Sequence, residues 1–295
     1  MEREKTLRPM GLADILDETL DLYRGNLLLF ATIAALLVVP FTVIQASLSP
    51  ISMLWSSFAH LASPSTVSTA QLDAMLRETG TLAGVNVLYL VLYVFMLAAL
   101  TQAVSSRFLG RPTTLADCYG YVARRAGSFF LTCALVGLLF LGAMLAVVIP
   151  VLGWIGGPVL LVVFYFWTAF VPQVFIVEGR KYRAAIRRSR QLAKGHWLRM
   201  FVLGLLAGLI SYIFQIMGAT VGLALAAAGV KWAGVNAISG FFQGAATSLA
   251  LPIPIVAWIV LYYDIRIRKE GFDLEMLARE LTAGHPSPPT EVPEK

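Results

Sequence analysis

Residues 26–48 read NLLLFATIAALLVVPFTVIQASL and contain no Lys, Arg, Asp or Glu. At about 1.5 Å per residue, a helix of this length spans roughly 34 Å, which is enough to cross a hydrocarbon core of about 30 Å. Five further runs without charge follow, at residues 82–104, 128–149, 155–177, 200–229 and 241–263. We therefore predict an all-α, polytopic membrane protein whose six transmembrane helices form three hairpins.

The composition of the chain points to the same class of protein. Hydrophobic residues make up 58% of the sequence and charged residues only 14%. A soluble chain carries about 25% charged residues, so this one lacks the polar side chains needed to cover a water-facing surface. A water-soluble globular enzyme is excluded.

The basic residues lie in alternate loops. Of the 23 Lys and Arg residues, only Arg77 and Lys231 lie between the first and second or the fifth and sixth runs, and none lies between the third and fourth. The positive-inside rule then places both termini and the two basic loops in the cytoplasm. The net charge of +6 is thus a topology signal, and we expect no nucleic acid as a partner.

An internal repeat precedes the odd-numbered runs. Residues 8–14 (RPMGLAD) match residues 111–117 (RPTTLAD) at five positions, and a degenerate third copy begins at Arg180. Each copy leads through an amphipathic stretch to a Gly followed by a polar residue, and then into an apolar run. We therefore predict three parallel repeats, each made of a cytoplasmic amphipathic helix, a glycine elbow and a helical hairpin.

The first and third amphipathic stretches differ in charge. Asp14, Asp17, Glu18 and Asp21 make the first acidic, whereas residues 180–194 carry seven basic residues. A basic cluster beside a membrane helix attracts anionic headgroups, at about 1 kcal/mol per charge. Our hypothesis is that the acidic N-terminal helix packs beside the basic helix and leaves surplus positive charge for lipid phosphate. In the simpler alternative, the basic residues set the topology and bind no specific ligand.

The last apolar run ends in YYDIRIRK, residues 262–269. Asp264 and Arg268 are four residues apart on a continuing helix and can form an ion pair, and Tyr262 and Tyr263 suit the aromatic belt at a membrane interface. A more specific hypothesis is that this segment and the basic loop together form a binding site for a lipid headgroup. The candidate lipid-contacting residues are Arg183, Arg187, Arg188, Arg190, Lys194, Asp264 and Arg266.

The sequence offers little catalytic chemistry. The six runs contain no acid or base, the three histidines are far apart, and no hydrolase, zinc-protease or nucleotide-binding motif occurs. We expect no enzyme activity, no cofactor and no metal site. Intramembrane amides such as Gln102 and Gln243, and glycine pairs four residues apart, are typical of helix packing. Pro40, Pro172, Pro252 and Pro254 favour kinked or broken helices, which keeps a small-solute or lipid transporter as the alternative.

Three segments resemble a known family: LRP to YRGN at residues 7–26, VEG followed by AIRRSRQLAKG at 177–195, and LYYDIRIRKEGFDL at 261–274. They look like the bacterial family of the glycerophosphoryl diester phosphodiesterase membrane domain. The resemblance implies a multi-pass inner-membrane module that can accompany a lipid-headgroup enzyme. We expect the membrane part without the catalytic barrel, because no histidine in the chain is followed by the arginine that such a barrel needs.

These observations predict three parts of the chain. Residues 1–25 form a cytoplasmic amphipathic helix, residues 26–264 a six-helix transmembrane domain, and residues 265–295 a cytoplasmic tail that is disordered from about residue 282. The predicted function is a non-enzymatic membrane scaffold or accessory module. Its predicted partners are anionic lipids and a membrane or cytoplasmic protein that the sequence does not identify.

Overall fold

The computed structural model describes residues 10–48, 69–147, 152–229 and 234–270, and this part of the chain is helical, with short turns and no strand. The helices are α1 (Leu12–Gly25), α2 (Leu27–Leu48), α4 (Thr69–Phe108), α5 (Leu115–Ala123), α6 (Ala126–Val147), α7 (Leu152–Thr168), α8 (Val171–Glu178), α9 (Tyr182–Ala193), α10 (Trp197–Ala227), α11 (Val235–Ala250) and α12 (Pro252–Glu270).

Six segments are long and apolar enough to cross a membrane: Leu27–Leu48, Gly80–Phe108, Ala126–Val147, Gly156–Glu178, Trp197–Ala227 and Val235–Glu270. The all-α, multi-pass membrane fold is thus confirmed. The fourth segment consists of α7 and α8, and the sixth of α11 and α12. Both breaks coincide with predicted prolines, because Pro172 lies in the first turn of α8 and Pro252 begins α12. Pro40, in contrast, lies inside the continuous helix α2.

The predicted repeat order is present, because the short helices α1, α5 and α9 directly precede the spanning helices α2, α6 and α10. The predicted glycine turn between the amphipathic and the spanning helix occurs only in the third repeat, where Gly195 has a φ of +86°. Gly25 is the last residue of α1, and Gly127 lies within α6. The last helix also continues past residue 264 to Glu270, and the tail predicted to be disordered from about 282 lies outside the described residues.

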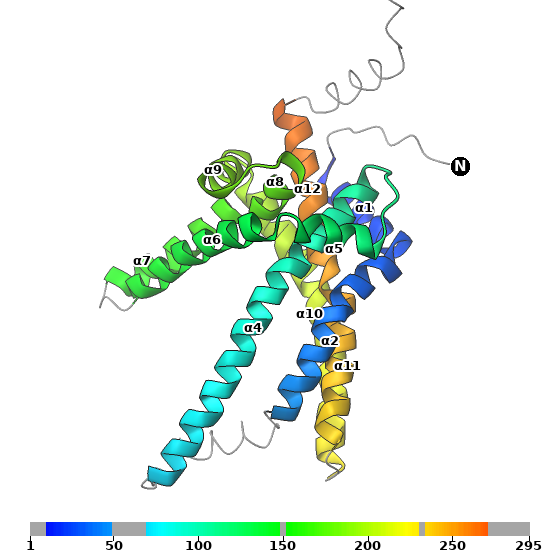
Figure 1. The fold of residues 1–295 in the computed structure, drawn as a ribbon. Coiled ribbons are helices and arrows are strands. Elements are labelled where there is room, and N and C mark those ends of the chain that lie inside the picture. Colours follow the sequence, from blue (N-terminus) through cyan, green and yellow to red (C-terminus); the bar gives the residue numbers. More distant parts are fainter. Residues whose placement is uncertain (1–9, 49–68, 148–151, 230–233, 271–295) are drawn as a thin grey trace, which may run out of the picture.

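Helix α12 forms the centre of one end of the molecule, with α1 and α9 on opposite sides of it (Figure 1). Almost every residue from Pro252 to Ile267 is buried. Helix α4 packs against α12 on a further side, whereas the hairpin of α6 and α7 points away from the other long helices. An apolar helix buried on all faces is typical of the middle of a bundle, and α12 has that position.

Helices α2 and α11 make the most intimate contact between spans. Gly240 and Gly244 of α11 lie directly against the backbone of α2 near Val39, Thr42 and Val43. Glycines four residues apart let two membrane helices approach closely, as the sequence predicted for this pair. Gln243 lies at a helix contact as predicted, next to Gly218 of α10, but the amides of Gln102 and Gln243 form no hydrogen bond between helices in the described residues. Within the described chain their amide nitrogens donate to a hydroxyl group of their own helix, four residues on, and not to a neighbouring helix.

Candidate functional site

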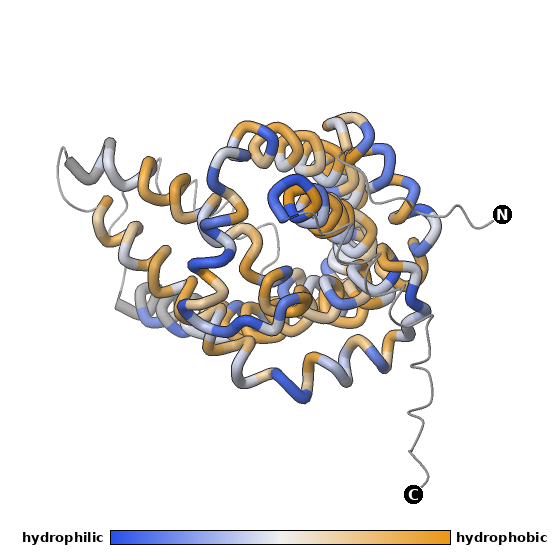
Figure 2. The backbone as a smooth tube through the Cα atoms, turned by 90° about the horizontal axis from the view of Figure 1, so that it is seen from above, coloured by the Kyte–Doolittle hydropathy of each residue, from blue (hydrophilic) through white to orange (hydrophobic). Residues whose placement is uncertain are grey.

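Most of the charged side chains gather at one end of the molecule. We call this region the charged end and define it as α1, α5, α9, the first turn of α10 and the last two turns of α12. Figure 2 looks at the molecule from this side and shows hydrophilic stretches interrupting the hydrophobic helices there. The contacts at this end connect all three repeats to α12.

Asp264 is the most deeply buried charge in the described structure, with none of its surface exposed. Its carboxylate accepts hydrogen bonds from the backbone N–H of Met10 at 2.8 Å, from Arg199 Nη1 at 2.7 Å and from Arg268 Nε at 3.0 Å. The carbonyl oxygen of Met10 in turn accepts from Arg199 Nη2 and Arg268 Nη2, both at 2.6 Å. A buried carboxylate needs this degree of compensation. The predicted ion pair with Arg268 is confirmed, and Arg199 and the Met10 peptide join it.

A second carboxylate, that of Glu178 at the end of α8, has 9% of its side-chain surface exposed. It lies 2.9 Å from Arg188 Nε on α9 and 3.0 Å from Arg180 Nε, and it accepts a hydrogen bond of 2.9 Å from the hydroxyl group of Tyr262. Arg266 approaches it to 3.9 Å. Glu178 thus connects α8, α9 and α12 through charge-assisted hydrogen bonds.

The last turn of α12 binds the side chains and the C-terminal end of α9. Glu270 forms ion pairs with Arg188 and Arg266. Lys269 Nζ donates to the carbonyl oxygens of Gln191, Leu192 and Lys194, at 2.8, 3.1 and 2.8 Å. These carbonyls end α9 and have no partner within that helix, so the ammonium group caps them and complements the helix dipole.

Tyr262 and Tyr263 face the interior of the protein and have no surface to offer to lipid. Both side chains are fully buried, and the hydroxyl group of Tyr263 lies 2.7 Å from Ser105 Oγ on α4 while its ring stacks on Phe108. The prediction of an aromatic belt is therefore wrong for this pair. Each phenol instead joins α12 to a neighbouring helix, because a buried hydroxyl group needs a hydrogen-bond partner.

The remaining cations of α9 face outward. Arg183, Arg187 and Arg190 are exposed, and their spacing of four and three residues places them on one face of the helix, while the exposed Lys194 follows as the C-cap residue. We call these four residues the basic stripe. Neither Arg183 nor Arg187 pairs with a carboxylate among the described residues. The guanidinium group of Arg190 lies over the ring of Trp167, 4.0 Å from its centre.

The structure therefore divides the seven predicted site residues into two groups. Arg183, Arg187, Arg190 and Lys194 form the stripe, and Arg188, Asp264 and Arg266 belong to the buried ion-pair network. The expected packing of the acidic N-terminal helix beside α9 is wrong, because α1 packs mainly on α12, which lies between α1 and α9 (Figure 1). The basic helix α9 obtains its carboxylates from Glu178 and Glu270 instead.

Sequence reasoning missed three participants: Glu178, Arg199 and the backbone of Met10. Glu178 carried a usable signal, because it is the only acidic residue between Asp117 and Asp264, a stretch that holds 11 basic residues. An isolated acid in such a basic stretch is a candidate for a buried ion pair. No sequence pattern indicates that a backbone peptide 254 residues away would bind Asp264.

The two carboxylates beside Arg188 strengthen its charge. Burial opposes the charge on Arg188, but the hydrogen bonds and charges of Glu270 and Glu178 outweigh it and raise the pKa of the guanidinium group above its ordinary value. Burial lowers the pKa of His196, and the nearby Lys269 and Arg199 lower it further, so this ring is neutral at pH 7. Among the described residues no three His, Cys, Asp or Glu side chains are grouped as metal ligands.

Comparison with known proteins finds no protein family, no curated protein and no solved structure that matches this chain.

Proposed function

We propose that the protein is a non-enzymatic scaffold or accessory module of the bacterial inner membrane, whose charged end faces the cytoplasm and contacts anionic lipid headgroups through the basic stripe of α9. The observation that carries this proposal is the stripe itself, three exposed cations on one face of α9 and a fourth at its C-terminal end, beside the spanning segments. Basic side chains in such a position attract anionic lipid at about 1 kcal/mol each. The resemblance to the glycerophosphoryl diester phosphodiesterase membrane domain agrees with this role.

The division of charges on α9 supports the proposal. Arg188 lies on the inner side of α9, where Glu178 and Glu270 neutralise it. Arg183 and Arg187 have no such carboxylate in the described chain and keep their charge for a ligand outside the protein. A helix whose cations served only to set the topology would not need this separation into a paired and an unpaired face.

The broken helices favour a scaffold over the transporter alternative. Pro254 cannot donate to the carbonyl oxygen of Ala250, and the hydroxyl group of Ser211 on α10 takes that place at 3.1 Å. The hydroxyl group of Tyr23 bonds the neighbouring carbonyl of Leu249 at 2.7 Å. A transporter would use such freed carbonyls to bind its solute, whereas here side chains of the protein already occupy them.

The orientation is testable with single cysteines. We expect a membrane-impermeant maleimide added to intact spheroplasts to label Arg77→Cys and not Asp17→Cys, each in a background with Cys118→Ala and Cys133→Ala. Both positions are exposed, and they lie at opposite ends of the predicted topology. Permeabilised cells, in which both variants should react, provide the control. Labelling of Asp17→Cys from outside would reverse the proposed orientation.

Removal of charge from the stripe tests lipid contact. We expect Arg183→Gln to lower the ratio of phosphatidylglycerol to phosphatidylcholine bound by the purified full chain about fivefold, and Arg183→Gln with Arg187→Gln about 30-fold, since each charge contributes about 1 kcal/mol. Native mass spectrometry from mixed micelles measures this ratio.

The matched control is Arg77→Gln, which removes one exposed charge from the other end of the molecule and should leave the ratio unchanged. A double variant that keeps the ratio of the unmodified protein would disprove headgroup contact by the stripe. Its melting curve, which we expect to match that of Arg77→Gln, shows whether folding is preserved.

A further inference from the structure

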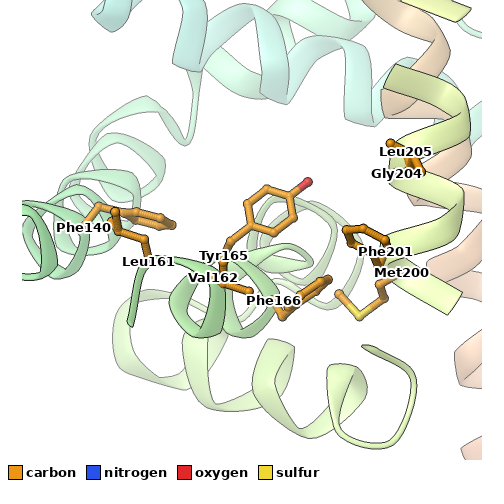
Figure 3. Close-up of a pocket in the computed structure, with 9 residues that line it drawn as sticks. All are labelled: Phe140, Leu161, Val162, Tyr165, Phe166, Met200, Phe201, Gly204 and Leu205. Atoms are coloured by element: carbon orange, nitrogen blue, oxygen red, sulfur yellow. The ribbon is translucent and has the colours of Figure 1, made fainter. Parts of the chain in front are cut away.

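An apolar crevice lies between the hairpin of α6 and α7 and the first half of α10. Its volume is about 470 Å³, and its walls come from one residue of α6, four of α7 and four of α10. Figure 3 shows Tyr165 and Phe166 on one wall and Phe201 and Gly204 on the other. No charged residue lines it, and the phenol of Tyr165 is the one hydroxyl group in the lining. The volume is in the range of pockets that hold small ligands.

The crevice is open because α10 has a glycine in its wall and because the hairpin of α6 and α7 diverges from α10. Gly204 has no side chain, so the wall of α10 is recessed there, and a Cβ at this position would meet only the edge of Trp258, at 3.4 Å. The hairpin of α6 and α7 points away from α10 (Figure 1), which leaves the walls apart. Both α7 and α10 belong to membrane-spanning segments, so lipid acyl chains are present at the depth of the crevice.

The basic stripe lies at one end of this crevice. Phe166 lines the crevice, and the next residue of α7, Trp167, carries the guanidinium group of Arg190 on its ring, 4.0 Å from the centre. Phe166 also stacks on Trp197, the first residue of α10, so both walls end at the charged end of the molecule. Arg187 is three residues from Arg190 on the same face of α9. An apolar slot in the bilayer thus opens beside two cations at its surface.

We infer that this crevice binds one anionic diacyl phospholipid, with an acyl chain between α7 and α10 and the phosphate group at Arg190 and Arg187. The inference rests on the proposed contact of the stripe with lipid and deepens it, because it adds a site of fixed position to a general attraction. Charge complementarity selects the occupant: a neutral chain would gain from the crevice alone, whereas an anionic lipid gains from both parts. An uncharged membrane-spanning run of a second copy would fill the crevice but bring no negative group to the two arginines.

The test uses phosphatidylglycerol that carries a diazirine on one acyl chain, photolysed with the purified full chain and mapped by peptide mass spectrometry. We expect label to concentrate on crevice residues of α7 and α10. Gly204→Leu, which fills the crevice, should lose this label. Gly208→Leu is the matched control, because Gly208 lies one turn further along α10, has open space around it and does not line the crevice. It should label like the unmodified protein.

A second pair of variants changes residues of α7, on the opposite wall of the crevice. This pair keeps the test valid if Gly204→Leu fails to fold. Val162 lines the crevice and Val159 does not, although both are exposed on α7. Val162→Trp should lose the label, and Val159→Trp should keep it. Equal labelling of the crevice in both members of each folded pair would overturn the inference.

The outcomes separate this inference from the broader proposal. Label spread evenly over the spans, together with a loss of phosphatidylglycerol preference in the Arg183 and Arg187 double variant, would overturn the crevice site and leave headgroup contact standing. Equal crevice labelling by a phosphatidylcholine probe would overturn the selection of an anionic lipid. A change of oligomeric state in Gly204→Leu without any crevice label would replace the lipid with a second copy of the chain.

Discussion

Asp264→Asn is expected to destabilise the protein by about 3–5 kcal/mol, the usual cost of removing one partner from a buried ion pair. The carboxylate receives hydrogen bonds from three donors, the Met10 N–H, Arg199 and Arg268, and none of its surface is exposed. An asparagine offers one acceptor oxygen and turns an NH₂ group toward the remaining donors. The two arginines keep their charge without a counterion.

The loss should be visible at the N-terminal helix first. The Met10 peptide connects α1 to α10 and α12, and Asp264 holds it there. We therefore expect Asp264→Asn to lower the melting temperature of the detergent-purified protein and to expose α1 to limited proteolysis. Asp17→Asn is the control, because Asp17 is exposed on α1 and its loss should change neither measurement. If both variants melt alike, the Asp264 cluster does not hold the charged end together.

The sequence was sufficient for the spanning segments and the order of the helices, which follow from local periodicity. Uncharged runs of membrane length predict the spanning segments, and the repeated Leu-Ala-Asp motif predicts that α1 and α5 precede α2 and α6. The Asp264 and Arg268 pair follows from the spacing of four residues on a helix. These features need no knowledge of which helices are neighbours.

The glycine elbows at Gly25 and Gly127 failed locally, because both residues are helical, but the other features that failed depend on tertiary neighbours. Helical periodicity shows that one face of α1 is apolar and that Ile15 and Leu22 lie on it, but not that α12 covers that face. The same limit applies to Tyr262. Its place near the end of the last run suited an interface, yet α12 is surrounded by α1, α4, α9 and α10, so its tyrosines are buried and bind Glu178 and Ser105.

A cluster of basic residues in the sequence does not by itself show which of them are exposed and unpaired in the structure. The seven cations of residues 180–194 are indistinguishable by composition. Their position around α9 distinguishes them, because Arg188 turns toward Glu178 and Glu270 whereas Arg183 and Arg187 turn outward. A helical wheel separates the two faces, but only the positions of Glu178 and Glu270 show which face is neutralised. The set of residues proposed to contact lipid is therefore reduced to the stripe.

The second large effect on stability is expected for substitutions at the contact between α2 and α11. A methyl group on Gly244 would overlap Thr42 Oγ1 and lie 2.9 Å from Val39 Cα, and one on Gly240 would lie 2.6 Å from the Thr42 carbonyl oxygen. Most of these neighbours are backbone or held to backbone, since the Thr42 hydroxyl group already donates to Val38 at 2.9 Å. Neither helix can yield locally, so the whole contact has to open.

We therefore expect Gly240→Ala with Gly244→Ala to destabilise the protein, because overpacking at about 1–3 kcal/mol for each site outweighs the gain of about 1 kcal/mol per residue that alanine brings as the better helix former. The control makes the same two changes at Gly137 and Gly208, where a Cβ would meet nothing within 4 Å. There only the helix preference acts, and the melting temperature should stay equal or rise. Opposite signs for one chemical change separate helix packing from helix propensity. Two shifts of the same sign would show that the close approach of α2 and α11 contributes nothing to stability.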